Sequence, residues 1–203
     1  MKKLIILIAL LVGSISFANA QNSDHFTFKG IPINGSVSNF GNQLVADGFT
    51  KIATNTYRGK FLRNDSVVTL VSDDNNMVWR VAAVMAHTNT WNTLEESFNN
   101  YVNLYSEKYG TPTTISKKLT TYTGDHSRTR TSATTGLEMG ALDDGECQYY
   151  AIWNLPQGSI EVRIVRGNEY YTDYRGWVVG CIRVEYTDNV NKDKVHQSDL
   201  DEI

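Results

Sequence analysis

Apolar and polar residues alternate with a period of two along the stretch from Cys147 to Asp188. This period predicts β-strands that bury one face and turn the other toward water. Pro156 and Gly158 predict a tight turn, so the stretch reads as a strand, a turn, a second strand and a long third strand. The apolar positions that define the buried face are Ile160, Val162, Ile164, Val178, Ile182, Val184 and Tyr186.

The second face of this stretch is predicted to present aromatic and charged side chains. Arg183 and Glu185 alternate with the buried positions of the last strand. Trp, Tyr and Arg are the residue types that carry most of the binding energy in protein interfaces. We therefore expect a protein partner to dock on this face, with Tyr149, Trp153, Trp177, Arg183 and Trp79 as contact residues.

Two stretches have the spacing of amphipathic helices. The first begins at a cap provided by Asn34 or Ser36 and ends before Gly48. The second runs from about Asn92 to Tyr109, with a capping box made by Asn92 and Glu95 or by Thr93 and Glu96. Its apolar stripe, which we expect to pack in the core, contains Trp91, Leu94, Phe98, Tyr101, Val102, Tyr105 and Tyr109.

The remaining segments predict further strands and polar connections. Strands are expected at 56–63, 66–72, 77–86 and 113–122, with Asn64 and Asp65 forming the first turn. Leu137 to Leu142 is predicted to be a strand, and the tail 189–203 to be frayed or ordered only by docking.

The polar run from Thr123 to Gly136 is predicted to be a long hairpin tip. Its Arg128 and Arg130 can grip a carboxylate or a sulfate, or they can simply keep the loop soluble. If the predicted aromatic face proves buried, this loop is the next place where we expect a partner.

A helix followed by three or four strands occurs twice, in residues 36–86 and 91–187. Neither unit buries much surface alone, so two units are expected to complete one another. The predicted fold is α+β: a tandem repeat of one helix plus a three- to four-stranded antiparallel sheet, with the helices on one face of a curved sheet. Residues 21–188 form one domain in this interpretation.

This organisation resembles the β-lactamase-inhibitor-protein-like fold, found in a group of exported bacterial proteins of uncharacterised function. The resemblance rests on the segment FKGIPINGSVSNFGNQLVADGF and on the pattern W-x-x-L-x6-Y-x7-YG-x-P from Trp91 to Pro112. It implies a curved sheet whose concave face binds a protein. The inhibitor's contact residues have no individual counterparts here, so the resemblance does not extend to β-lactamase as the target.

The first twenty residues have the pattern of a signal peptide. Lys2 and Lys3 precede an apolar run, and Ala18-Asn19-Ala20 provides the small residues of a cleavage site after Ala20. We therefore expect an exported protein, periplasmic or secreted, with no membrane span. The alternative is an uncleaved membrane anchor.

The charge balance is acidic. The 22 acidic residues outnumber the 19 basic ones by three, and by five once Lys2 and Lys3 are removed. This balance argues against nucleic acid as a partner, because sequence-independent binding needs a basic surface.

The only two cysteines, Cys147 and Cys181, can be bonded in an exported protein or can remain inert thiols. Both are expected to point away from the core. A simple meander, however, would place another strand between them, which is too wide for a disulfide.

The sequence contains no motif of an active site, a cofactor site or a metal site. His25, His87, His126 and His196 are far apart, and neither a G-x-S-x-G nor an S-x-x-K motif is present. We predict a non-enzymatic binding protein without cofactor or metal. The alternatives are a structural envelope protein with no partner at the sheet face and an enzyme whose convergent site leaves no motif.

Overall fold

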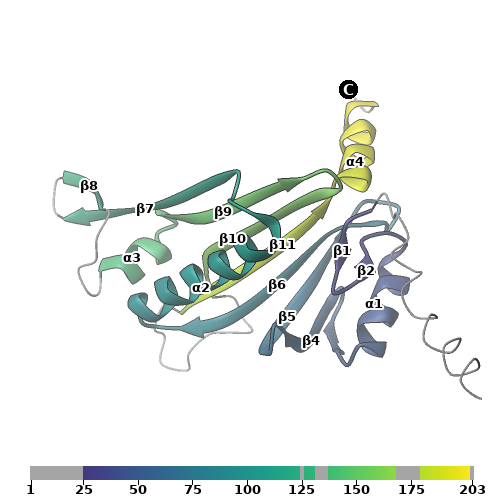
Figure 1. Ribbon diagram of the computed structural model, residues 1–203, viewed down its shortest axis with the longest axis horizontal. Helices are drawn as coiled ribbons and strands as arrows, with labels where there is room; N and C mark the ends of the chain where they lie inside the picture. The colour runs from purple at the N-terminus through teal and green to yellow at the C-terminus, as the bar shows by residue number, and fades with distance from the viewer. Residues whose placement is uncertain (1–24, 124–125, 131–136, 168–178, 202–203) are drawn as a thin grey trace, which may run out of the picture.

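The computed structural model describes residues 25–123, 126–130, 137–167 and 179–201. In this part of the chain, nine strands form one antiparallel sheet in the order β3-β4-β5-β6-β11-β10-β9-β7-β8 (Figure 1). The strands are β3 (Thr50–Ala53), β4 (Thr56–Phe61), β5 (Asn64–Ser72), β6 (Val78–Thr88), β7 (Thr114–Thr123), β8 (His126–Arg130), β9 (Cys147–Leu155), β10 (Gly158–Arg166) and β11 (Gly180–Asp188).

The described residues also form four helices and a small two-stranded sheet. The helix α2 crosses the sheet over β6, β10 and β11, whereas α1 lies against β3, and α3 contacts β7, β9 and β10. The last helix, α4, follows β11 directly and stands out from one end of the sheet (Figure 1). These elements are β1 (Thr27–Phe28), β2 (Ile31–Pro32), α1 (Val37–Ala46), α2 (Trp91–Tyr109), α3 (Leu137–Asp143) and α4 (Asn189–Asp201).

The predicted α+β class, with a large antiparallel sheet, is therefore confirmed. Ser36 caps α1, and its side chain accepts a hydrogen bond from the Asn39 backbone N–H. The capping box predicted for α2 is wrong: Thr90 is the N-cap, and its side chain makes no capping hydrogen bond. The strong apolar stripe defines this helix without that help.

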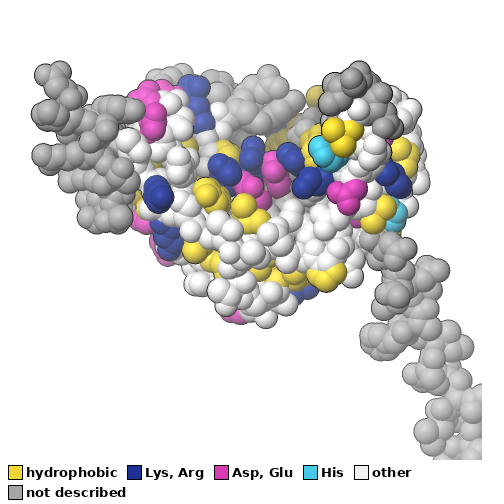
Figure 2. Space-filling model, turned by 90° about the horizontal axis from the view of Figure 1, so that it is seen from above, with side chains coloured by type: hydrophobic (Ala, Val, Ile, Leu, Met, Phe, Trp, Pro, Cys, Tyr) yellow, Lys and Arg dark blue, Asp and Glu magenta, His cyan; other side chains and the backbone are white. Residues whose placement is uncertain are grey.

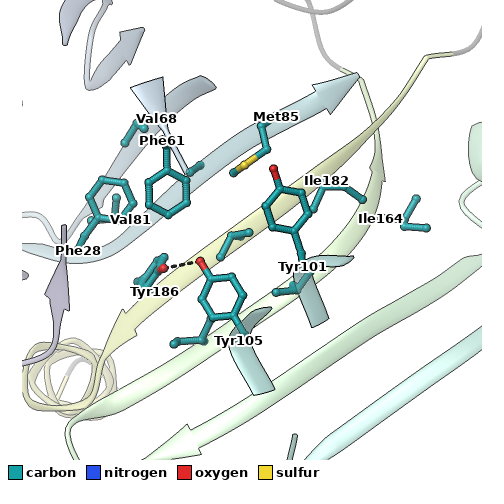
Figure 3. Packing of buried hydrophobic residues seen from close by; sticks show 14 of the residues in the cluster. Phe28, Phe61, Val68, Val81, Met85, Tyr101, Tyr105, Ile164, Ile182 and Tyr186 are labelled. Carbon is teal, nitrogen blue, oxygen red and sulfur yellow. Dashed lines mark hydrogen bonds between the residues drawn. The ribbon is translucent and has the colours of Figure 1, made fainter. Parts of the chain in front are cut away.

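The core lies between one face of the sheet and the helices α1 and α2. In β10, Ile160, Val162 and Ile164 are buried, as the period of two predicts. Aromatic rings from β1, β4 and α2 close the same layer, and Figure 3 shows Phe28 and Phe61 beside Tyr186 and Tyr105. We call this the helix side of the sheet and its opposite the open face.

The two central strands, β6 and β11, pair antiparallel although they are far apart in the sequence. Val81 lies opposite Tyr186 and Ala83 opposite Val184, and all four residues belong to the core. This pairing joins β3–β6 to the strands of the second half of the chain in one continuous sheet.

Two local predictions are wrong, and one left open is decided. Leu137–Asp143 is the helix α3 and not a strand. Of the two alternatives for the tail, order by docking holds, because residues 189–201 form α4 and pack against β6, β10 and β11. The turn between β4 and β5 consists of Leu62 and Arg63, not of Asn64 and Asp65. Asn64 instead pairs with Phe61 as the first residue of β5.

Asp188 explains why the tail is ordered. This fully buried carboxylate accepts hydrogen bonds from the backbone N–H of Asn191 at 2.9 Å and of Phe26 at 2.6 Å, and lies 3.0 Å from His25 Nδ1. A carboxylate that accepts the free N–H groups of a first helical turn stabilises that helix. Asp188 thus fastens both α4 and the N-terminal segment to the end of β11.

Asn191 adds a second attachment. Its side-chain amide donates hydrogen bonds to the backbone carbonyls of Ile33 at 3.0 Å and of Val78 at 2.9 Å. Because Asn191 is almost fully buried, these bonds fix the base of α4 between the N-terminal segment and β6.

We expect Asp188→Ala to lower the free energy of unfolding by about 2–4 kcal/mol, because it leaves the buried Phe26 N–H without an acceptor. Urea denaturation measures the loss. Asp193→Ala is the matched control on the exposed surface of α4 and should change stability by less than about 0.5 kcal/mol. Equal stability of the two variants would contradict this assignment.

Candidate functional site

The structure places two of the predicted contact residues inside the core. Trp153 is 1% exposed, and its indole N–H donates to the Gly110 carbonyl at 2.8 Å. Tyr149 is 5% exposed and donates from its hydroxyl to Glu95 Oε1 at 3.1 Å. The prediction that these rings lie on the open face is therefore wrong.

The reason lies in the composition of β9. Both alternating sets of this strand contain large apolar residues, so periodicity alone does not show which set is buried. The apolar stripe of α2 determines which set is buried, because Trp91 and Phe98 pack edge-on against Tyr149. Tyr150 and Ile152 consequently belong to the open face.

The side chains of three other candidates lie outside the described part of the structure. Trp177 lies outside the described residues. Arg128 and Arg130 belong to β8, of which only the backbone is described.

The open face carries a row of charged side chains across its central strands. Glu161 of β10 lies opposite Glu185 of β11, and Arg163 lies opposite Arg183. Like charges in directly opposite positions repel one another. They are held here by ion pairs along each strand: Arg163 with Glu161, and Arg183 Nε with Glu185 Oε1 at 3.0 Å.

Arg80 of β6 extends this row, which we call the charge ladder: Arg80, Glu161, Arg163, Arg183 and Glu185. Arg80 Nη1 lies 3.7 Å from Glu185 Oε2, so Glu185 serves two arginines. In Figure 2 a row of basic and acidic side chains crosses the middle of the molecule.

The arginines of the charge ladder keep unused binding capacity. Arg80 Nε and Arg183 Nε are buried, and within the described part of the chain neither has a hydrogen-bond partner. Arg183 Nε is close to Glu185, but its N–H is not aligned with the carboxylate. The side chains of Arg80 and Arg183 remain 34% exposed and that of Arg163 32% exposed, so a partner can reach the guanidinium groups but not the two buried Nε atoms.

Two aromatic rings of the open face orient these arginines. The Arg163 guanidinium lies 4.8 Å from the centre of the Tyr150 ring, and that of Arg80 lies 4.3 Å from the Trp79 ring. Stacking of this kind stabilises the cation and restricts the side chain. The guanidinium groups are therefore partly immobilised before any partner arrives.

A β-bulge places Trp79. Ser72 pairs with Val78, which is buried in the core, and Val71 pairs with Arg80 on the open face, so Trp79 has no residue opposite it. Because its ring lies beneath the Arg80 guanidinium, we assign Trp79 to the open face. It lines a groove of about 440 Å³ between β5, β6 and α4, together with Val71, Asp73, Asp74, Lys194 and Val195.

The open face as a whole is basic. Among the described positions of β4–β7 and β9–β11, it carries six basic and three acidic residues. This is a surplus of three positive charges on a chain whose net charge is −3. The basic residues are Arg58, Lys60, Arg80, Lys118, Arg163 and Arg183, and the acidic ones are Asp65, Glu161 and Glu185.

Cys147 and Cys181 are free thiols on opposite faces of the sheet. Cys147 pairs with Leu119 and packs against the core, whereas Cys181 pairs with Val165 on the open face, and β10 lies between them. The expectation that both point away from the core is wrong for Cys147. Burial raises the pKa of Cys147 to about 11 and that of Cys181 to about 12, which keeps both thiols protonated.

Within the described ranges, no group of three or more His, Cys, Asp or Glu residues could hold a metal ion. No described helix combines the length and the apolar character that crossing a bilayer requires.

Comparisons with known protein families, with curated protein sequences and with solved structures find no match to this chain.

Four members of this site were not predicted from the sequence: Arg80, Glu161, Arg163 and Tyr150. The signal was present for Glu161 and Arg163, which alternate with the predicted core positions of β10. Arg80 could not be placed in this way, because the bulge at Trp79 interrupts the alternation of β6.

The two thiols should react slowly in the folded protein. With a pKa of about 11, about one Cys147 thiol in a thousand is ionised at pH 8, against about a quarter of free cysteine. We expect alkylation by iodoacetamide, followed by mass spectrometry, to be at least about 100-fold slower than in urea-unfolded protein. Its rate should rise about tenfold per pH unit up to pH 10. Alkylation of the folded protein at the rate of free cysteine would contradict these environments.

Proposed function

We propose that the chain is an exported, non-enzymatic binding protein whose open face docks on an acidic surface of a protein partner. The charge ladder provides the central contacts, and Trp79 and Tyr150 provide aromatic contacts beside it. Trp79 and Tyr150 take the role of aromatic contact residues that the sequence suggested for Tyr149 and Trp153, which belong to the core.

The observation that carries this proposal is that the open face has a net positive charge whereas the whole chain has a net negative charge. A basic face on an acidic protein favours approach in one orientation and selects against basic partners. Carboxylate groups on the partner would also meet the exposed parts of the Arg80, Arg163 and Arg183 side chains. They would thereby offset the repulsion between Arg163 and Arg183.

The residue types and their restraint support a protein partner. Arg, Trp and Tyr dominate the energetically important positions of interfaces. The guanidinium groups of Arg80 and Arg163 are already stacked on rings, so less conformational entropy is lost when they bind.

We also propose that the protein is exported. This part of the proposal rests on the signal-peptide pattern of residues 1–20, which lie outside the described residues.

We further infer that residues 36–86 and 91–187 are two helix-plus-sheet units. This inference is supported by the sheet order, in which the last strands of the two segments, β6 and β11, meet at the centre. Membership of the β-lactamase-inhibitor-protein-like fold is likewise a proposal, based on the sequence segments that resemble it.

A labelled oligoglutamate peptide tests the chemistry of the face. We expect it to bind the wild type, and the triple variant Arg80→Gln, Arg163→Gln, Arg183→Gln to bind it at least about tenfold more weakly in fluorescence anisotropy, because three charge-assisted contacts are lost. Affinity should also fall as salt is added.

The matched control is Lys51→Gln, Lys108→Gln, Lys117→Gln, which removes the same charge from the helix side. The hydrogen bond that Lys117 donates to Asn99 on α2 places this lysine on the helix side. Circular dichroism verifies that both triple variants are folded. An equal loss of affinity in both would show that only net charge matters and would contradict a binding face.

Capture from an envelope and secretome extract then seeks the natural partner. The proposal requires a protein that the wild type and the lysine control retain, that the arginine variant loses, and that oligoglutamate displaces. Absence of any such protein would favour the alternative of a structural envelope protein.

A further inference from the structure

A second candidate site lies on the helix side of the sheet, away from the charge ladder. It is an open pocket of about 310 Å³ between the C-terminal half of α2 and the turn that joins β4 to β5. This volume is at the lower end of the range for small-molecule sites, so it suits a single-ring compound. The lining residues are Leu62, Leu104, Tyr105, Glu107, Lys108, Tyr109 and Tyr186.

Two tyrosines that line the pocket, Tyr105 and Tyr186, are joined by their hydroxyls. The hydroxyls of Tyr105 and Tyr186 lie 2.5 Å apart and share a hydrogen bond (Figure 3). Burial raises the pKa of both residues, so both remain protonated in ordinary conditions.

The shared bond uses only one of the two hydroxyl protons. Neither hydroxyl has another hydrogen-bond partner among the described residues. Tyr105 is 5% exposed and Tyr186 is 7% exposed, and both residues line the pocket. The pair therefore offers one O–H donor to a molecule in the pocket.

Two exposed leucines form the apolar part of the lining. Leu62 is 38% exposed and Leu104 is 46% exposed, although side chains of this size are usually buried. They come from different elements, the β4–β5 turn and α2, and line the same small pocket. An apolar ligand that covered both would remove this surface from water.

The turn that presents Leu62 is conformationally strained. Leu62 has φ of 48° and Arg63 has φ of 67°, so both lie in the left-handed region. A two-residue turn of this kind favours Asn followed by Gly, which adopt positive φ at low cost.

Asn64 holds the strained turn in place. Its side-chain amide donates to the Leu62 carbonyl and to the Tyr101 hydroxyl, each at 2.9 Å. The chain thus maintains an unfavourable conformation that places an exposed leucine beside the tyrosine pair. Strain that persists in this way is typical of binding sites.

We propose that this pocket binds a small, neutral aromatic molecule that carries one hydrogen-bond acceptor. Its ring packs against Leu62 and Leu104, and its acceptor takes the remaining proton of the Tyr105–Tyr186 pair. The site is independent of the open face, so either can be present without the other.

Two probes of nearly equal shape test the proposal. Acetophenone carries a carbonyl acceptor, and ethylbenzene lacks it. In methyl NMR spectra of the intact protein, acetophenone should shift the Leu62 and Leu104 signals to saturation, with a dissociation constant of about 1 mM or below. Ethylbenzene should bind about five- to tenfold more weakly, because it leaves the hydroxyl proton unused.

A double variant of the tyrosine pair tests the polar contact. Tyr105→Phe with Tyr186→Phe removes both hydroxyls and keeps both rings, a change that costs little stability because no buried partner is left behind. The affinities of the two probes should then become equal. A preference for acetophenone that survives this change would overturn the role of the tyrosine pair.

A second double variant tests the turn. Leu62→Asn with Arg63→Gly suits positive φ, so it should raise the midpoint of thermal unfolding while weakening both probes at least about fivefold. Unchanged binding in this variant would overturn the proposal. Failure of both probes to saturate the leucine signals of the wild type would overturn it too.

Discussion

The register between β6 and β11 determines the chemistry of both sides of this molecule. Val81 and Ala83 meet Tyr186 and Val184 on the helix side, which leaves Arg183 to point the other way. Side chains alternate strictly along strands, so a slip of one residue would move every group to the opposite face. The large aromatic layer beneath α2 prevents such a slip, because it cannot be exposed without losing most of the core.

Two surfaces of different character follow from this constraint. The helix side buries aromatic rings and leaves a small pocket at the Tyr105–Tyr186 pair, where the packing of α2 against the β4–β5 hairpin is incomplete. The open face carries arginines in excess over carboxylates, some with unused donors. A surface of this kind is stabilised further when it meets negative charge.

The sequence allowed most of the framework to be predicted and less of the site. Strong periodicity identified α2 and β10, and the alternation of Arg183 and Glu185 placed them on the open face. Tyr149 and Trp153 were misplaced because β9 is apolar in both alternating sets, so only the contact with α2 decides its orientation. The tail lacks a helical stripe, and α4 depends on the long-range bonds of Asp188, which local patterns do not reveal.

Hydroxyl-radical footprinting of Tyr149 and Tyr150 shows directly whether this register puts the aromatic set inside and the charge ladder outside. The two residues are adjacent in the chain and lie on opposite faces of β9, so fragment-ion mass spectrometry can compare them within one peptide. We expect oxidation of Tyr150, which lies on the open face, and protection of Tyr149, which is 5% exposed. Preferential oxidation of Tyr149 would show that the faces are reversed.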